Sequence, residues 1–158
     1  MVRYPLSKKE KRKIAPLLTK FFGLEESTVK KTVVIKEKKG TYELFIVNDT
    51  PALIVTSNGD IIPHLKYFLK NPNAPTSLPK IRVDQGAVIP IGKGADLMAP
   101  GITDIEGDFN KGELAIVIAP NGAAIAIVRT LYGRNDMGRL VKGKVAKNIH
   151  HIGDKYWL

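Results

Sequence analysis

Three prolines lie within the nine residues from Asn71 to Pro79, close to the middle of the 158-residue chain. Proline has no backbone N–H and fixes its own φ, so neither a regular helix nor a central strand continues through such a segment. Polar turn residues fill most of the other positions, which is typical of a connection between folded parts. The chain length fits one ordinary domain or two small ones. The segment therefore predicts two domains, over residues 1–75 and 80–158.

The first half begins with a strong helix signal. Ser7 and Glu10 are spaced as a capping box, in which each side chain accepts a hydrogen bond from the other residue's backbone amide. Apolar residues recur at helical spacing from Ile14 to Phe22, and Gly23 is a suitable helix end. Pro16 conflicts with this pattern because it removes an interior hydrogen bond. We therefore expect a helix with a kink or a broken first turn at Pro16.

Strand signals follow this helix. Segments rich in β-branched and aromatic residues, with turn residues between them, predict strands. Asn58-Gly59 predicts a type I′ hairpin turn. The expected strands are Lys31–Lys38, Tyr42–Val47, Ala52–Thr56 and Ile61-Ile62, and His64–Leu69 is expected to form a short helix.

The second half has the pattern of a β fold. The expected strands are Ile81–Val83, Ala87–Ile91, Leu114–Ala119, Ala123–Leu131, Lys144–Ile152 and Tyr156–Leu158, with a hairpin at Pro120-Asn121-Gly122 and a helix-like insertion at Gly94–Ala99. About six short strands in roughly 80 residues favour a closed or nearly closed barrel. The expected fold class is α+β, a small α/β domain followed by a pseudo-barrel of short, mostly antiparallel strands.

Charge points to the class of partner. The formal net charge is +10, and residues 1–40 alone hold 12 basic and 4 acidic side chains. Such an excess attracts polyanions at long range, which makes nucleic acid the first candidate and an anionic membrane surface the second.

The longest apolar run, Leu114–Pro120, is too short to span a bilayer as a helix. Residues 1–13 lack the apolar core of a secretory signal. We expect a soluble, intracellular protein.

Two segments could contact phosphate. The first is the basic run that contains Lys8, Lys9, Arg12 and Lys13, whose alternative is an ordinary solvated helix face. The second is the loop Gly92–Ala95, which is expected to open a helix and to expose backbone amides to an anion. The alternative for this loop is a tight turn between a strand and a helix. It is not a Walker A motif, because neither Ser nor Thr follows Lys93.

The inventory of reactive side chains argues against an enzyme. The chain has no cysteine, which removes thiolate catalysis, disulfides and Cys-based zinc sites together. His64, His150 and His151 are its only histidines, and the adjacent pair on a strand would face opposite sides. No serine lies in a nucleophile elbow, and no carboxylate pair has recognisable acid–base spacing. We expect no catalytic residue, no metal and no cofactor.

A family resemblance becomes visible in the second half. The segments Val83–Ala87, Gly94–Ile102, Gly112–Ala115, Ala124–Ile127, Lys142–Lys144 and Ile152–Trp157 resemble, in order and spacing, a PUA domain, a small RNA-binding barrel appended to many tRNA- and rRNA-acting proteins. The most specific motif is Gly94-Ala95, four intervening residues, and Pro100-Gly101-Ile102.

The resemblance extends over nearly the whole chain. Asn58–Asp60, Pro63–Pro72 and Lys147–Trp157 are similar to the malignant-T-cell-amplified/translation-machinery-associated (Tma) family, whose members place a pre-PUA domain before the PUA domain. The lysine-rich N-terminal region and the segment Tyr132–Leu140 depart from the eukaryotic pattern and are closer to archaeal members. The family implies a cytoplasmic, non-catalytic protein that acts on the small ribosomal subunit in initiation, reinitiation or recycling. Eukaryotic members work with a density-regulated partner.

The resemblance also implies site residues. In PUA domains RNA lies against the segment that corresponds here to Lys93, Gly94, Ala95, Asp96, Leu97 and Met98. Lys142, Lys144 and Lys147 extend this into a basic track for tRNA or rRNA. An alternative function is an RNA-recruiting accessory subunit of a tRNA- or rRNA-modifying enzyme, because similar two-domain modules occur at the C-terminus of archaeal tRNA-guanine transglycosylases.

Overall fold

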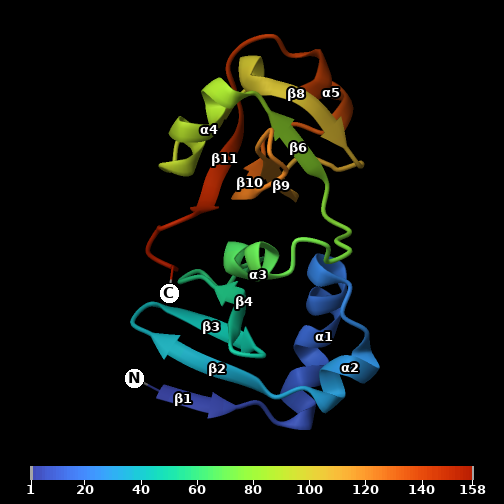
Figure 1. Cartoon of the computed structure of the whole chain (residues 1–158), viewed down its shortest axis with the longest axis vertical. Coiled ribbons are helices and arrows are strands. Elements are labelled where there is room, and N and C mark those ends of the chain that lie inside the picture. The colour runs from blue at the N-terminus through green and yellow to red at the C-terminus, as the bar shows by residue number, and fades with distance from the viewer. Residues whose placement is uncertain (1, 158) are drawn as a thin grey trace. The chain divides into compact units, whose positions relative to one another are not determined.

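The computed structural model describes residues 2–157 and divides into two compact units between Ser77 and Leu78. Each unit carries its own sheet. The N-terminal unit has an antiparallel meander in the order β1-β2-β3-β4-β5 together with three helices (Figure 1). Its elements are β1 (Val2–Pro5), α1 (Lys8–Phe22), α2 (Glu26–Lys31), β2 (Val34–Lys39), β3 (Tyr42–Val47), β4 (Thr50–Val55), β5 (Ile61–Pro63) and α3 (Leu65–Lys70).

Helix α1 confirms the expected start and end. Ser7 is the N-cap, both hydrogen bonds of the capping box with Glu10 are present at 3.1 Å, and Gly23 closes the helix in the left-handed conformation. Of the two outcomes expected at Pro16, a kink or a broken first turn, the broken turn is wrong, because α1 runs through Pro16. Pro16 lies on the exposed face of α1. It has no N–H to donate to the Arg12 carbonyl oxygen, so water can donate that hydrogen bond instead.

The hairpin expected at Asn58-Gly59 forms, but its turn type differs from the prediction. Asn58 has no positive φ, so the turn there is not type I′. Instead Gly59, at φ +91°, donates to the Thr56 carbonyl, and Thr56 donates to Asp60. Asn48 and Asp49 have the two positive φ values that a type I′ turn requires, and they join β3 to β4.

Helix α2 was missed in the sequence. The strand expected from Lys31 begins at Val34, because Lys31 is the last residue of α2. The Lys11 ammonium donates to the carbonyl oxygens of Lys30 and Thr32, at 2.8 and 3.1 Å, and so closes the C-terminal end of α2. A cation at a helix C-terminus also complements the helix dipole.

An aromatic cluster joins α1 to α3 in the core of the N-terminal unit. The Phe22 ring centroid lies 4.2 Å from that of Tyr67 and 4.9 Å from that of Phe68. All three side chains are buried, and rings of this size dominate the energy of a small core. The helix expected over His64–Leu69 is confirmed, with His64 as its N-cap.

The C-terminal unit is a six-stranded sheet in the order β7-β11-β10-β9-β6-β8. All its strand pairs are antiparallel except β6–β9. This confirms the expected α+β class with a second domain of short, mostly antiparallel strands. Its elements are β6 (Lys80–Val83), α4 (Gln85–Gly92), β7 (Leu97–Met98), the 3-10 turn η1 (Ala99–Gly101), β8 (Ile102–Glu106), β9 (Leu114–Ile118), β10 (Ala124–Thr130), α5 (Arg134–Arg139) and β11 (Lys144–His151).

Three predictions in this unit are wrong. The strand expected over Ala87–Ile91 is helix α4, because the Asp84 carboxylate caps it by accepting from the Ala87 amide at 3.0 Å. The helix expected over Gly94–Ala99 is a turn followed by β7, since Gly94 lies beyond the end of α4. Tyr156 and Trp157 lie in a turn rather than a strand, and Leu158 lies outside the described residues.

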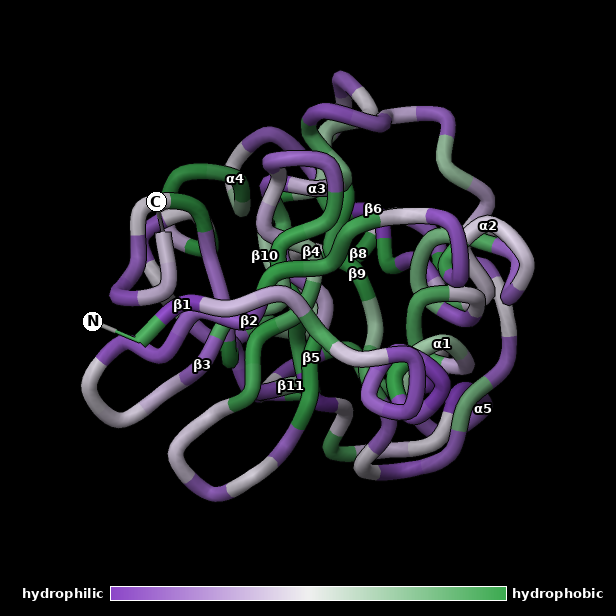
Figure 2. Tube along the Cα trace, turned by 90° about the horizontal axis from the view of Figure 1, so that it is seen from below, coloured by the Kyte–Doolittle hydropathy of each residue, from purple (hydrophilic) through white to green (hydrophobic). Residues whose placement is uncertain are grey.

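The core of the C-terminal unit lies between β6, β9, β10 and β11 and the helices that cover them. In Figure 2 the strands β9 and β10 are mostly hydrophobic. Helix α4 contacts β10 and β11, and its buried residue is Ile91. Within residues 2–157, no helix is both long and apolar enough to cross a bilayer.

Candidate nucleic-acid interface

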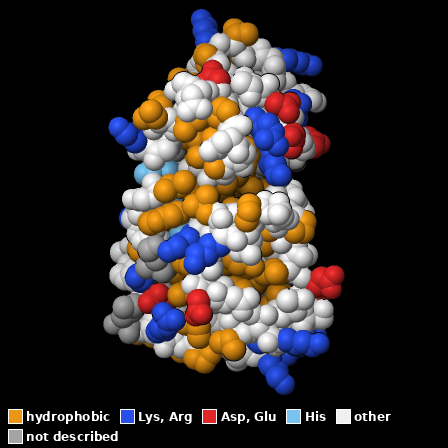
Figure 3. Space-filling view, in the orientation of Figure 1, with side chains coloured by type: hydrophobic (Ala, Val, Ile, Leu, Met, Phe, Trp, Pro, Cys, Tyr) orange, Lys and Arg blue, Asp and Glu red, His pale blue; other side chains and the backbone are white. Residues whose placement is uncertain are grey.

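An open pocket of about 380 Å³ lies between α4, the turn that follows it, β7 and η1. Its walls are mainly apolar, and hydrophobic side chains are exposed over α4 in Figure 3. Among residues 2–157, the charged groups in its lining are two carboxylates. The lining residues are Asp84, Gly86, Ala87, Pro90, Ile91, Ala95, Asp96, Met98, Pro100 and Gly101. A pocket of this size and character suits one small planar group.

The pocket is held open by close packing between α4 and η1. The Asp84 amide donates to the Gly101 carbonyl at 2.9 Å, which fixes the start of α4 against η1. A Cβ atom at Gly101 would lie 3.1 Å from Ala87 Cβ, tighter than an ordinary contact. Gly101 thus sets the distance between the two walls.

The glycine loop does not offer free amides, contrary to the sequence prediction. The Gly94 amide donates to the Ile91 carbonyl, and the Ala95 amide donates to the Pro90 carbonyl, each at 3.0 Å. These bonds close the C-terminal end of α4, where the helix dipole is negative and disfavours an anion. The phosphate cradle expected from free amides at Gly94 and Ala95 is therefore wrong.

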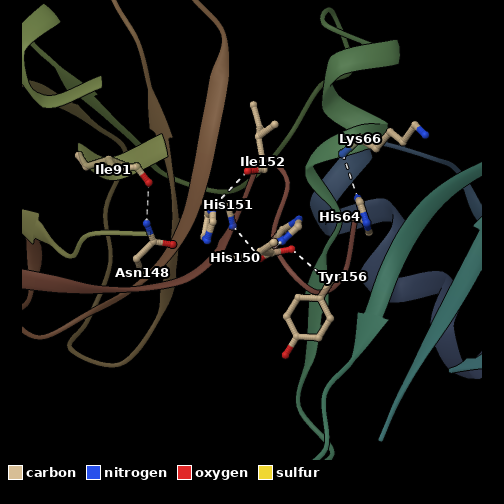
Figure 4. Close-up of polar contacts among 9 residues, drawn as sticks. His64, Lys66, Ile91, Asn148, His150, His151, Ile152 and Tyr156 are labelled. Atoms are coloured by element: carbon tan, nitrogen blue, oxygen red, sulfur yellow. Dashed lines mark hydrogen bonds and ion pairs between the residues drawn. The ribbon is translucent and has the colours of Figure 1, made fainter. Parts of the chain in front are cut away.

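Asn148 of β11 ties the turn to the sheet. Its side-chain amide donates to the carbonyl oxygens of Ile91 and Ala95, both at 3.0 Å, and Figure 4 shows the contact with Ile91. Its backbone amide donates to Asp96 Oδ1 at 2.8 Å. The side-chain oxygen of Asn148 is buried and has no partner within the described residues. One side chain thus fixes two walls of the pocket.

Asp96 links the pocket to the lysines of β11. Its Oδ2 lies 3.1 Å from Lys144 Nζ. Burial raises the pKa of Asp96, but hydrogen bonds from the Asn148 amide and Lys144, with the charges of Lys144 and Lys147, outweigh it and hold that pKa below its ordinary value. Asp96 is therefore ionised at neutral pH and repels phosphate from this wall.

Gly94 packs against the ring of His151. It has φ +102°, and a Cβ there would lie 3.0 Å from His151 Nε2. His151 Nδ1 lies 3.1 Å from the Ile152 carbonyl oxygen, as Figure 4 shows. The neighbouring His150 is fully buried and lies 2.8 Å from Asp154 through its Nδ1. Both histidines therefore have structural contacts here.

Eight of the nine site residues predicted in the second half fall into three groups, and the ninth is Gly94, which packs against His151. Ala95, Asp96 and Met98 line the pocket. Leu97 is fully buried in the core, so its side chain cannot contact RNA. The exposed residues outside the pocket lining are Lys93, Lys142, Lys144 and Lys147, of which Lys144 pairs with Met98 in the β7–β11 ladder.

Sequence reasoning missed the α4 wall of the pocket. Asp84, Ala87 and Pro90 lie on this wall, and Asp84 was read only as part of a family motif. An aspartate three residues before Ala87, followed by a short apolar run, is also the pattern of an N-capped helix. That signal could have identified α4 and, with it, this side of the pocket.

The basic residues of α1 form one exposed stripe. Lys8, Lys9, Arg12 and Lys13 are all exposed and lie within one arc at about 100° per residue. The buried residues, such as Leu18, occupy the opposite arc. Lys11 falls within the buried arc and is used to close α2, so it is not part of this stripe.

Family models match both units. Residues 79–152 match the PUA domain, and residues 2–71 match a domain of unknown function, DUF1947. A solved structure, that of a conserved PUA domain protein from Thermoplasma acidophilum, superposes with a TM-score of 0.82 at 25% identity and covers 98% of this chain and 96% of its own.

Relatives extend over most of the chain. An uncharacterised protein of Methanocaldococcus jannaschii is 34% identical over 166 residues, which covers 98% of this chain and 94% of the relative. Translation machinery-associated protein 20 of Saccharomyces cerevisiae is 32% identical over 116 residues, which covers 69% of this chain and only 62% of the yeast protein. The chain belongs to the malignant-T-cell-amplified/translation-machinery-associated (Tma) family, as an archaeal-type member with a C-terminal PUA domain.

Proposed function

We propose that this protein is a non-catalytic, cytoplasmic RNA-binding protein of the translation machinery, which binds tRNA or small-subunit rRNA during initiation, reinitiation or recycling. The observation that carries the proposal is the apolar pocket of the PUA unit, which lies directly beside the exposed lysines of β11. Membership of the Tma family and the name of the yeast relative support the link to translation.

The pocket and the lysines suit different parts of an RNA strand. Lys93, Lys142 and Lys147 are exposed point charges that can neutralise phosphates and release counterions. The pocket is apolar and carries two carboxylates, so it accepts a base and rejects a phosphate. A base can enter only if it is unstacked, which favours a single-stranded end or loop over a regular duplex.

The stripe on α1 supplies a second set of phosphate contacts in this proposal. Lys8, Lys9, Arg12 and Lys13 are exposed along one helix face. They can strengthen binding to a long RNA without reading its sequence, because phosphate contacts position a protein but do not distinguish bases. A tRNA or rRNA large enough to reach both units should therefore bind more tightly than a short oligonucleotide.

The pocket chemistry also supports a binding role rather than a catalytic one. Among residues 2–157, those that line the pocket include no serine, histidine or lysine. Asp96 is engaged by Asn148 and Lys144, and Asp84 caps α4. The proposed partners beyond RNA are the small ribosomal subunit and a density-regulated-type translation factor.

Binding of the purified protein to intact tRNA and to tRNA trimmed at its 3′ end tests the proposal. We expect tight binding to intact tRNA at 50 mM salt and weaker binding at 200 mM salt, by a factor of about 10³ or more if six phosphates are neutralised. Trimming should weaken binding further if the unpaired end enters the pocket. Equal binding to both tRNAs would favour small-subunit rRNA. The proposal would be contradicted if binding to tRNA and to small-subunit rRNA did not weaken with salt, or if neither RNA were bound.

A further inference from the structure

We propose that Asp84 makes the pocket prefer bases that carry an exocyclic amino group, namely cytosine, adenine or guanine, over uracil. This inference rests on the proposed function and adds a specificity-determining residue to it. It depends on which hydrogen-bonding atoms the pocket leaves available after the fold has used the others.

Asp84 has a carboxylate oxygen to spare. Its Oδ1 accepts from the Ala87 amide at 3.0 Å and caps α4. Across the described part of the chain, no hydrogen bond or ion pair reaches its second oxygen, and the side chain is exposed at the pocket. The other carboxylate in the lining is different. Asp96 receives the Asn148 amide on Oδ1 and lies beside Lys144 through Oδ2.

A free carboxylate oxygen is an acceptor without a proton to donate. It can accept from N4 of cytosine, N6 of adenine or N2 of guanine, whereas O4 of uracil at the same place would face it as a second acceptor. Cytosine and uracil have nearly the same shape, so the apolar walls around Pro90, Ile91 and Met98 cannot distinguish them. The discrimination must come from a polar group, and among the described side chains that line the pocket Asp84 is the one with an oxygen that makes no hydrogen bond or ion pair.

An asparagine at this position converts the acceptor into a donor. Asn caps a helix as well as Asp, so Asp84→Asn keeps the hydrogen bond from the Ala87 amide. Its side-chain NH₂ then occupies the place of the free oxygen and can donate to O4 of uracil. Asp84→Ser keeps a cap but has no second polar atom. The first variant should reverse the preference, and the second should abolish it.

Affinity for two single-stranded RNA hexamers, one of cytidines and one of uridines, tests the inference. We expect the wild-type protein to bind the cytidine hexamer about tenfold more tightly, in line with the discrimination of a charged hydrogen bond. In Asp84→Asn the ratio should fall below one, and in Asp84→Ser it should approach one. Because a ratio is compared, the general gain in affinity from losing a negative charge cancels.

Asp136→Asn is the matched control, since it removes an exposed carboxylate of α5 outside the pocket. It should keep the wild-type ratio, and circular dichroism should show all variants folded. An unchanged ratio in folded Asp84→Asn, or no preference in the wild-type protein, would overturn the role of Asp84 while salt-dependent RNA binding persists. If the wild-type protein bound no RNA at low salt, both this inference and the proposed function would fail.

Discussion

The double variant Lys93→Glu/Lys147→Glu is expected to bind RNA about 100-fold more weakly than the wild-type protein at 0.1 M salt, with a salt dependence reduced by about two counterions. Both side chains are exposed, and no hydrogen bond or ion pair within residues 2–157 engages the ammonium of either. Their reversal should therefore leave the fold intact. Affinity measured over a series of salt concentrations checks the prediction.

Lys144 is excluded from this variant because it pairs with Asp96 at 3.1 Å, and its reversal would place two carboxylates together. The control is Lys70→Glu/Lys111→Glu, which reverses two exposed lysines outside the pocket and the β11 segment. Both variants change the net charge equally. If the two lost affinity to the same extent, the attraction would be due to net charge alone, and the proposed track beside the pocket would be wrong.

Gly23→Ala is expected to destabilise the N-terminal unit by about 3 kcal/mol or more. Gly23 ends α1 at φ +70°, where an alanine costs about 1 kcal/mol from backbone sterics alone. A Cβ there would also lie 2.3 Å from Pro75 Cγ and 2.6 Å from the Pro75 carbonyl oxygen. Contacts this short cannot be relieved by a side-chain rotation, because one of the atoms is backbone.

The variant Gly40→Ala separates the cost of the positive φ from the cost of the contact with Pro75. Gly40 has φ +58°, yet a Cβ there would meet no atom within 4 Å. It should therefore lose only the conformational part, about 1 kcal/mol. Urea unfolding followed by circular dichroism measures both variants. Equal losses of unfolding free energy in the two variants would mean that the contact between the added Cβ at Gly23 and Pro75 contributes nothing to the destabilisation.

Local signals predicted those parts of the fold in which neighbours in sequence determine the structure. The capping box at Ser7 and the glycine at Gly23 predict both ends of α1. The strands β3, β9 and β10 were found because their apolar residues are bounded by turn residues. By contrast, the five apolar residues from Ala87 to Ile91 are too few to distinguish a buried strand from a helix.

The candidate site was only partly predictable, because its geometry depends on distant residues. The family resemblance indicates the segment 93–98, but the pocket is also lined by residues of α4 and η1. The contacts that fix the turn join Asn148 to Ile91, Ala95 and Asp96, between 52 and 57 residues away in sequence. No pattern within a short window reports such pairs. The stripe on α1 was predictable, except that folding uses Lys11 to close α2.

The most direct test of the RNA interface is chemical-shift mapping of the ¹⁵N-labelled protein during titration with a single-stranded RNA. A chain of 17.4 kDa is well suited to this measurement. We predict that the largest amide shifts fall on residues 84–101 and 142–148, around the pocket and the adjoining lysines. Shifts confined to the opposite edge of the sheet, over β8 and the loop before β9, would contradict the account.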